Sequence, residues 1–378
     1  MQVPVRVLDA ARLRVDPPVL IALASSTIVF IATPFLIVPI AEQFDVSAGA
    51  AGLISTAQLT GFVIASWAAG RFLRPVRRNF AAIGVLGIIA NLGSAVAPSL
   101  TILAAWRLVS GLSLGLAAWF AWQAAFGNAR RTGDTAVVGP LVGIVTPPAI
   151  ATLVSLGDAD LVFLVLAVVA GSPLLLLGRI PRADRLRPHT TRHAATPAAR
   201  WILLALTMVT MGGSAVFVYG AAIGEDEVGL SPGVISLLFS ANALVSIPAA
   251  KWTRSHGPAG VWFAATSVLA FLLAAVHVEV VFAFTLVAWG FVFFMATPAA
   301  FSLLASRSVF PEERAGDAQA VMALGRVFGP AVGGALLAAG QPIAHGAVAS
   351  GTMFSAALLL LVVERRTTAV SGPDAISR

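Results

Sequence analysis

Twelve apolar runs, each long enough to cross a lipid bilayer, constrain this chain more than any other feature of its sequence. A membrane-spanning helix needs roughly 20 mostly apolar residues, and the runs are about that long. They fall at residues 18–41, 49–70, 80–97, 100–127, 135–156, 160–178, 201–223, 232–250, 258–277, 280–305, 318–340 and 343–363. The pattern predicts an all-α membrane protein with twelve transmembrane helices.

The composition agrees with a protein that has lipid as its main solvent. Charged residues make up 11% of the 378 residues and apolar residues 58%, whereas soluble domains carry about 25% charged residues. Twelve spans would use roughly 240 residues, which leaves no room for a large domain outside the membrane. The chain has no cysteine, which excludes disulfides, thiolate nucleophiles and cysteine-based metal sites.

The distribution of basic residues predicts how the chain sits in the membrane. Of the 24 Lys and Arg residues, all except Arg107 and Arg326 lie outside the apolar runs. They lie in the tails and in loops after even-numbered runs, whereas loops after odd-numbered runs carry acids, as at residues 225–227. By the positive-inside rule we expect both termini on the cytoplasmic side of the inner (plasma) membrane. The basic excess therefore indicates topology and lipid contact, and not a nucleic-acid partner.

A duplication predicts two pseudo-symmetric six-helix bundles. Residues 131–134 read Arg-Thr-Gly-Asp after the fourth run, and residues 314–317 read Arg-Ala-Gly-Asp after the tenth. Gln58 and Asn242 each follow by eleven residues a serine that precedes the second or the eighth run. Such repeats are typical of transporters. We expect an N-terminal bundle over 1–178, a basic linker over 179–200, a C-terminal bundle over 201–363 and a tail over 364–378.

Three motifs carry a family resemblance. Residues 70–78 read Gly-Arg-Phe-Leu-Arg-Pro-Val-Arg-Arg, and residues 107–111 read Arg-Leu-Val-Ser-Gly. The eleventh run holds G-x-x-x-G-P-x-x-G-G, of which the fifth run keeps a part; the residues concerned are Gly325, Gly329, Pro330, Gly333 and Gly334, and Gly143, Pro147 and Pro148. Over essentially its whole length the chain resembles the major facilitator superfamily, whose loop pattern G-x-x-x-D-R-x-G-R-R/K has Asp where this chain has Arg74. The resemblance implies the major facilitator fold, with the glycine–proline motif packing helices as in exporters.

The resemblance also implies a central cavity lined by the first, fourth, seventh and tenth helices. On these helices the candidates for binding substrate are Phe30, Thr33, Trp119, Trp122, Ser214, Phe217, Trp289 and Phe293. A largely apolar pocket with a few hydroxyl groups suits a neutral or anionic amphipathic compound. The alternative for each aromatic residue is ordinary helix packing. Tyr219, the only tyrosine, is expected in the aromatic belt at the outer interface.

Two arginines lie deep in the apolar runs. An arginine at such a depth costs ~2.5–3.5 kcal/mol or more unless it faces protein or water. For Arg107, the ninth candidate for binding substrate, we expect a fixed positive charge at the cavity that holds an anionic group or modulates a proton site. The alternatives are a structural arginine bonded to backbone carbonyls, or one that reaches outward along the membrane. Arg326 lies inside the glycine motif, which favours a structural role.

The acidic residues suggest a gate rather than a proton site. All 17 lie in loops, in tails or in the first turn of a run, so no carboxylate at mid-depth identifies a coupling residue. The resemblance places the second helix beside the eleventh and the eighth beside the fifth. This brings Arg71 and Arg74 near Asp317, and Lys251 and Arg254 near Asp134. We expect these groups to latch the cytoplasmic side in the outward-open state; the alternative is that both aspartates cap their helices.

The function expected from these features is secondary active transport. The substrate is expected to be a small neutral or anionic amphipathic compound, exported by alternating access with proton antiport as the candidate energy source. The alternative is a transporter that takes up a small metabolite. A membrane enzyme is a remote alternative, because the sequence has no cluster of acid, base or nucleophile. We expect no cofactor, no metal site and no catalytic activity, with the monomer as the working unit.

Overall fold

The computed structural model describes residues 15–125, 129–180, 193–250 and 257–366, and helices are its only regular structure within these ranges. The long helices are α2 (Pro17–Gln43), α4 (Leu53–Phe72), α5 (Arg77–Ala95), α6 (Leu100–Ala125), α7 (Ala129–Gly171), α8 (Pro197–Phe217), α10 (Pro232–Ala250), α11 (Ala259–Ala275), α12 (Glu279–Ser306), α13 (Pro311–Ala338) and α14 (Pro342–Arg366). The short ones are α3 (Ala48–Ala51), α9 (Gly220–Ala222), the 3₁₀-helix η1 (Ser172–Arg179) and the π-helix η2 (Ile223–Glu227). The expected all-α class is confirmed.

Local signals explain several of the helix starts. Proline stands in the first turn of α2, α8 and α13, where its missing N–H costs no hydrogen bond. Ser47 caps α3 by accepting a hydrogen bond from the backbone nitrogen of Ala50, and Thr196 caps α8 by accepting one from Ala199. Inside the membrane each backbone group must be satisfied within its own segment, which favours helices for the apolar runs.

The number of spans depends on α7 and α11. Ten helices in the described ranges are long and apolar enough to cross a bilayer, and α11 is a shorter apolar helix. One of the ten runs from Val137 to Arg179, through most of α7 and the whole of η1, but its backbone is non-helical at Gly157 and Asp158. This break falls between the fifth and sixth apolar runs. The count of twelve stays a prediction, because it requires α11 and each arm of α7 to cross separately.

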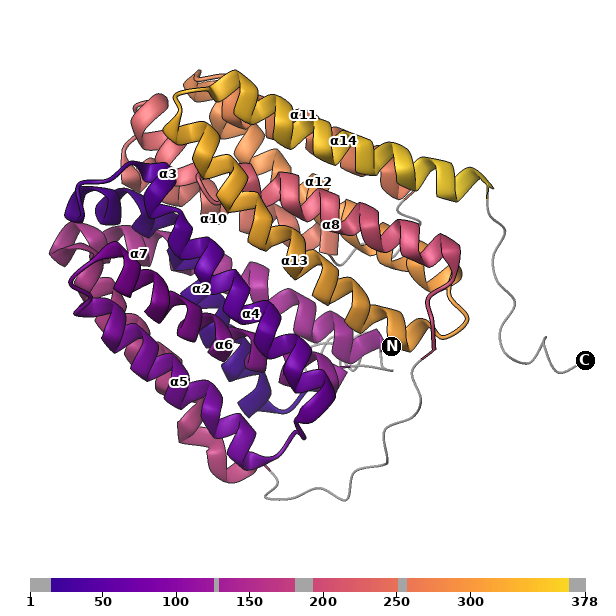
Figure 1. Ribbon diagram of the computed structural model, residues 1–378, viewed down its shortest axis with the longest axis horizontal. Helices are drawn as coiled ribbons and strands as arrows, with labels where there is room; N and C mark the ends of the chain where they lie inside the picture. The colour runs from indigo at the N-terminus through magenta and orange to yellow at the C-terminus, as the bar shows by residue number, and fades with distance from the viewer. Residues whose placement is uncertain (1–14, 126–128, 181–192, 251–256, 367–378) are drawn as a thin grey trace, which may run out of the picture.

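The helices form two groups that lie side by side (Figure 1). In the N-terminal group, α2–α7, α6 packs on α4 and α5, while α7 packs on α2 and α5. In the C-terminal group, α8–α14, α8 packs on α13 and α14, and α12 packs on α10 and α11. The two groups meet where α4 contacts α13 and where α7 contacts α10. These are the pairs that the resemblance implies; the domain boundaries stay a prediction, since residues 181–192 lie outside the described ranges.

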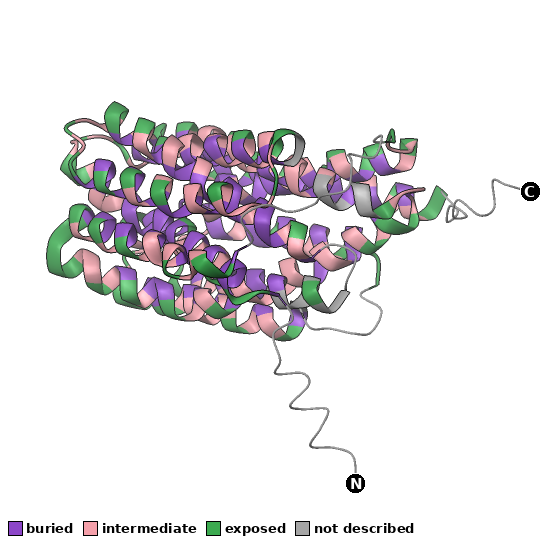
Figure 2. Ribbon diagram, turned by 90° about the horizontal axis from the view of Figure 1, so that it is seen from below, coloured by how far each residue is buried: buried purple, intermediate pink, exposed green. Residues whose placement is uncertain are grey.

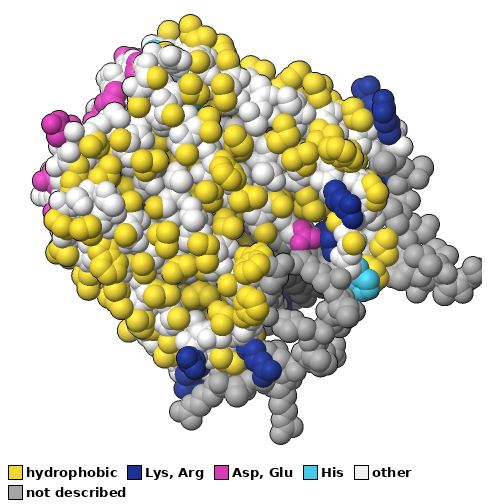
Figure 3. All heavy atoms as spheres, viewed as in Figure 1, with side chains coloured by type: hydrophobic (Ala, Val, Ile, Leu, Met, Phe, Trp, Pro, Cys, Tyr) yellow, Lys and Arg dark blue, Asp and Glu magenta, His cyan; other side chains and the backbone are white. Residues whose placement is uncertain are grey.

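The side chains are sorted as expected for a protein surrounded by lipid. Figure 2 shows buried residues along the inside of the bundle and exposed ones on its outer surfaces. Large apolar side chains such as Leu175, Val168 and Phe284 are exposed, whereas the polar side chains of Asn91 and Arg107 are buried. Figure 3 shows a broad apolar surface, with acidic side chains gathered at one end and Lys and Arg at the opposite end. We call these the acidic end, where α2 ends and η2 lies, and the basic end, where α12 ends and α13 begins.

Candidate functional site

A cavity of about 390 Å³ lies between the two groups of helices. Its wall combines residues of α2, α4 and α7 with residues of α8, α10, α12 and α13. The lining includes Thr27, Phe30, Thr33, Ser55, Gln58, Gly143, Pro147, Thr210, Ser214, Phe217, Phe239, Asn242, Ser246, Trp289, Phe293, Phe294 and Arg326. Because both groups contribute, any movement of one group against the other changes the shape of this cavity.

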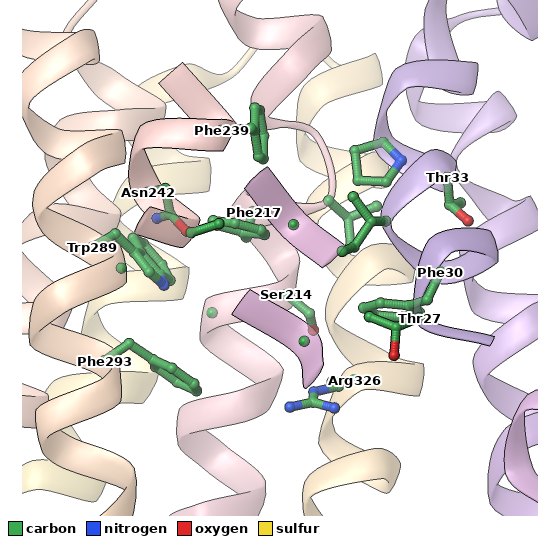
Figure 4. A pocket seen from close by; sticks show the side chains of 18 of the residues that line it. Thr27, Phe30, Thr33, Ser214, Phe217, Phe239, Asn242, Trp289, Phe293 and Arg326 are labelled. Carbon is green, nitrogen blue, oxygen red and sulfur yellow. The ribbon is translucent and has the colours of Figure 1, made fainter. Parts of the chain in front are cut away.

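Aromatic rings form one side of the cavity wall. The ring of Phe217 lies 5.3 Å from that of Phe239 and 5.7 Å from that of Trp289, measured between centroids. Phe293 lies beyond Trp289 on α12, and Phe30 faces this row from α2 on the opposite side (Figure 4). Edge-to-face and tilted ring contacts of this kind stabilise aromatic clusters and leave flat apolar surface for a ligand.

Six of the nine expected binding residues line the cavity. They are Phe30, Thr33, Ser214, Phe217, Trp289 and Phe293. They come from α2, α8 and α12, the first, seventh and tenth of the expected spans. Their role in binding substrate stays a prediction.

The three candidates on α6 are placed elsewhere, which corrects the expectation that they face the cavity. Trp119 is buried in a separate apolar cluster, where its ring lies 4.9 Å from that of Phe120. Trp122 is half-buried and is not part of the cavity lining, and neither is Arg107. The physical reason is that α6 packs against α4 and α5, so its buried side chains point into the N-terminal group.

Arg107 is fully buried at the centre of a polar network in the N-terminal group. Its Nη1 donates a hydrogen bond to Oδ1 of Asn91 at 3.0 Å, and its Nη2 donates one to Oε1 of Gln58 at 2.9 Å. Its guanidinium carbon also lies 5.3 Å from the centre of the Phe163 ring. The structural alternative for Arg107 thus has support, with side-chain amides in place of the backbone carbonyls that were expected as partners.

Gln58 and Arg326 line the cavity, although the expected binding set contains neither. Gln58 connects Arg107 to the cavity wall, because it lines the cavity and accepts the hydrogen bond from Arg107. The same side-chain oxygen also accepts a hydrogen bond from Thr33 at 3.0 Å. The guanidinium of Arg326 lies at one end of the cavity, below Ser214 in Figure 4. The depth of Arg326 in the eleventh apolar run is the sequence feature that could have indicated a place at the cavity, but the surrounding glycines favoured a packing role.

Asn242 occupies in the C-terminal group the place that Gln58 has in the N-terminal group. Its Nδ2 donates a hydrogen bond to the carbonyl oxygen of Leu286 on α12 at 2.7 Å. Both amides therefore bond inside their own group of helices, and both line the cavity. The duplication seen in the sequence is thus preserved in the wall of the cavity.

The glycine–proline motif packs helices closely. A Cβ atom added at Gly325, Gly329 or Gly333 would collide with backbone atoms of α8, which places α13 directly against that helix. Gly143 faces Ala243 of α10, and Pro147 lines the cavity, whereas Pro148 is half-buried outside the lining.

Tyr219 joins the two groups of helices at the acidic end. Its side chain is fully buried, which corrects the expectation of a place in the aromatic belt. Its hydroxyl donates a hydrogen bond to the carbonyl oxygen of Pro330 at 2.7 Å and lies 3.5 Å from that of Gly49 on α3. Gly334 also packs against Gly49, since a Cβ atom there would meet both Tyr219 and the Gly49 carbonyl. The acidic end is therefore closed by direct contact between α3 and α13.

Two of the expected latch residues, Arg74 and Asp317, lie at the basic end. Asp317 forms an ion pair with Arg314, one turn earlier in α13, at 2.7 Å between Nη1 and Oδ2. Arg74 is exposed, and its side chain forms no ion pair with the residues that the structure describes. Lys251 and Arg254 lie outside the described residues, as do the side chains of Arg71 and Asp134. The latch stays a prediction.

Comparison with known proteins agrees with this architecture. The human organic anion transporter MFSD10 has a similar structure, with a TM-score of 0.66 and 16% identity over 95% of this chain and 100% of that chain. The D-xylose–proton symporter gives a TM-score of 0.69 and 14% identity over 91% of this chain and 96% of that chain. A bacterial homologue of the human lysosomal transporter Spinster, in an inward-facing and occupied conformation, gives a TM-score of 0.64 and 13% identity over 96% of each chain. No curated protein sequence matches the chain.

At these identities the structural likeness shows the fold alone. The family model for the major facilitator superfamily matches residues 19–333, from the start of α2 into α13. The contacts between α4 and α13 and between α7 and α10, with a cavity between the groups, agree with that match. The chain therefore belongs to the major facilitator superfamily.

Proposed function

We propose that this protein is a secondary active transporter that exports a small amphipathic organic compound, neutral or anionic, by alternating access. The observation that carries the proposal is the cavity of about 390 Å³ lined by both groups of helices. Small-molecule sites commonly enclose about 300–1,000 Å³ and are mostly apolar with a few polar groups. The ring cluster around Phe217 and the hydroxyl groups of Thr27 and Ser214 supply such a surface.

The closed acidic end supports a mechanism in which the two groups rock against each other. If the basic end faces the cytoplasm, as the distribution of Lys and Arg predicts, the contacts of Tyr219 and Gly334 with Gly49 close the outer side. Substrate release to the outside then requires these contacts to break while the basic ends of the helices approach.

Export is favoured over uptake by the glycine–proline motif. In α13 the motif is intact and lets the helix pack closely on α8; in α7 its remnant faces the cavity and α10. The similarity to both an organic anion transporter and a D-xylose–proton symporter shows that this fold serves substrates of different kinds.

Proton antiport is the proposed energy source, although the cavity itself offers no carboxylate. None of the lining residues that the structure describes is Asp, Glu or His. Any proton carried in exchange must then bind outside the lining, or its movement must be linked to the protonation of the substrate.

Inside-out membrane vesicles provide the test. The probes are 2-naphthoate, an anion, and 2-naphthamide, a neutral compound of similar size. With an acidic lumen, we expect at least one of them to accumulate, and a protonophore to abolish the accumulation. As a control, Ser214→Cys in the cysteine-free chain is blocked with a benzyl methanethiosulfonate, which places a bulky group in the cavity. Accumulation that persists after the block contradicts the cavity as the transport path, and net flux only out of the lumen contradicts export.

A further inference from the structure

Two positive charges lie at or directly behind the cavity wall. Arg326 on α13 is part of the lining, and its guanidinium makes no hydrogen bond or ion pair with the residues that the structure describes. Its five N–H donors are thus free to bind a ligand. No Asp or Glu of the described residues lines the cavity to offset this charge.

Arg107 supplies the second charge from behind Gln58. It is 0% exposed, and its partners are the neutral oxygens of Asn91 and Gln58 and the ring of Phe163. A buried cation normally has an anionic partner. Here the described residues provide none, so the positive field of Arg107 reaches the cavity without a local counter-charge.

The contact with Arg107 also fixes the orientation of the Gln58 amide. A guanidinium can only donate hydrogen bonds, so the side-chain oxygen of Gln58 must face Arg107. Thr33 donates to the same oxygen at 3.0 Å. Nε2 is the other polar atom of this amide, and the Gln58 side chain lines the cavity. This nitrogen is buried without a hydrogen-bond partner. Gln58 is 1% exposed, so this unpaired donor is a costly feature unless a ligand or water satisfies it.

The duplicated half shows that this arrangement is not a general consequence of the fold. The backbone carbonyl of Gln58 lies against Gly111, and that of Asn242 lies against Gly290 in the same way. Four residues before Gly111 stands Arg107; four residues before Gly290 stands Leu286. The C-terminal copy therefore lacks the arginine, and its amide donates to the Leu286 carbonyl instead.

We propose that the cavity binds the head group of an organic anion, a carboxylate or sulfonate, between the guanidinium of Arg326 and the amide of Gln58. The apolar body of the ligand then lies on the rings of Phe217, Trp289 and Phe293. Arg107 acts as a positioning residue, which orients Gln58 and adds to the positive field. This inference rests on the proposed transport function and narrows its substrate class from neutral or anionic to anionic.

The field in the cavity is measured with a single cysteine, Ser214→Cys, since the native chain has none. Its rates of reaction with anionic sulfonatoethyl methanethiosulfonate and cationic trimethylammonioethyl methanethiosulfonate are each divided by the rate with a small free thiol. We expect the normalised anionic rate to exceed the cationic rate by roughly tenfold. Arg326→Gln should lower this ratio at least about threefold, and Arg107→Met by less, because its charge lies behind Gln58 and not in the lining itself.

Arg200→Gln is the matched control, because Arg200 is exposed at the start of α8 and is not part of the cavity lining. It should leave the ratio unchanged. If Arg326→Gln does not fold, the ionic strength is varied on Ser214→Cys alone, and salt should reduce the preference for the anion. A ratio of one or less, or one that Arg326→Gln and salt do not change, overturns the inference.

Transport separates failure of this inference from failure of the proposed function. In inside-out vesicles 2-naphthoate should accumulate at least about five times faster than 2-naphthamide, and Gln58→Glu should remove most of that preference, because its carboxylate cannot donate. Accumulation of the amide alone, or of both alike, contradicts the anion site and leaves export intact. A cysteine that reacts with neither reagent contradicts both, because a transport cavity must be open to water in one of its states.

Discussion

Arg107 and Arg326 show how the surroundings of a residue decide what an intramembrane charge does. Both interrupt apolar helices, and both carry a cost unless they face polar groups. Arg107 is enclosed by the side chains of Asn91, Gln58 and Phe163, and both of its terminal nitrogens donate a hydrogen bond within the protein. Arg326 lies at the cavity, where water or a ligand has to satisfy it. One arginine therefore organises the wall and the other faces the cavity.

Removing the Arg107 side chain should destabilise the N-terminal group of helices. Arg107→Met keeps much of the volume but leaves Oδ1 of Asn91 without its donor, which costs about 1–3 kcal/mol for a buried acceptor. We expect a melting temperature several degrees lower in detergent, and partial recovery when Asn91→Leu is added, since this also removes the orphaned oxygen. If the double variant melts no higher than the single one, the Asn91 contact does not contribute to stability.

The sequence predicts the depth of each arginine but not the direction in which it points. Depth follows from position along an apolar run, because each residue advances a helix by about 1.5 Å. Direction depends on how the helix is rotated within the bundle, and the apolar residues of α6 surround its axis, so its pattern carries no such signal. The same ambiguity placed Trp119 and Trp122 at the cavity. The lining residues of α2 and α8 include hydroxyl groups, and those of α12 include the aromatic pair Trp289 and Phe293; on these helices the expectation and the structure agree.

At the scale of single helices, close packing by glycine distinguishes α13 from its neighbours. Gly325, Gly329 and Gly333 recur every four residues and so form one stripe, which α8 contacts with its backbone. In a membrane such stripes strengthen helix association, because lipid provides no hydrophobic driving force between helices. The motif quoted from the sequence thus corresponds to a contact inside the C-terminal group.

The stripe can be tested with one methyl group. Gly329→Ala places a Cβ where the carbonyl oxygen of Met211 and the nitrogen of Ala215 lie, and overpacking of this kind costs about 1–3 kcal/mol. Gly351→Ala in α14 is the control, since no atom lies within 4 Å of the added Cβ. We expect Gly329→Ala to lower the melting temperature by several degrees and Gly351→Ala to leave it equal or slightly higher, because alanine favours a helix. Equal melting of the two variants contradicts close packing at Gly329.

Tyr219 provides the corresponding contact between groups at the acidic end. Tyr219→Phe keeps the ring but removes the hydroxyl, whose contact with the Gly49 carbonyl at 3.5 Å crosses between the groups; its hydrogen bond to Pro330 lies within the C-terminal group. Loss of the crossing contact costs the closed arrangement about 1 kcal/mol. We expect a larger fraction of molecules open at this end. Spin labels on exposed Gln43 and Gln341, one from each group, should show a longer distance more often than in the parent protein. An unchanged distance distribution means that the glycine contacts close this end without the hydroxyl.

For the whole molecule, the two groups are copies that have diverged in charge. The order of the helices, the break near Gly157 and the pairing of α4 with α13 follow from run lengths, repeats and the family resemblance. The state of the transporter does not follow from them, because states that open to different sides use the same helices and apolar faces. The difference between Arg107 and Leu286 at equivalent positions is visible in the sequence, but its meaning requires the contacts of Gln58 and Asn242.

The topology makes a prediction that introduced cysteines can test. A cysteine at Asp226, in η2 at the acidic end, should react with a membrane-impermeant maleimide in intact cells. A cysteine at Arg200, exposed at the start of α8, should react only after the cells are opened. Labelling of position 200 but not 226 in intact cells would show that the chain is inserted the other way round.

The basic end should be controlled by the charges that gather there. In this structure Asp317 pairs with Arg314 on its own helix, and Arg74 on the neighbouring group is exposed. We expect Asp317 to turn to Arg74 when the basic ends of α4 and α13 approach, that is, in the outward-open state. An exposed ion pair contributes only about 0–1 kcal/mol, but a near-balanced equilibrium responds to that amount by several-fold.

Charge reversal separates a latch between the groups from a role within α13. Asp317→Arg should place like charges together and increase the inward-open population several-fold, whereas adding Arg74→Asp should restore an attractive pair and bring the population back. Distances between spin labels at Arg78 and Ser306, on opposite groups at the basic end, report the two states. Raising the salt concentration should weaken both effects, because the pair is exposed. If Arg74→Asp gives no recovery, the contribution of Asp317 lies in its pair with Arg314 and in the start of α13, and the latch does not exist.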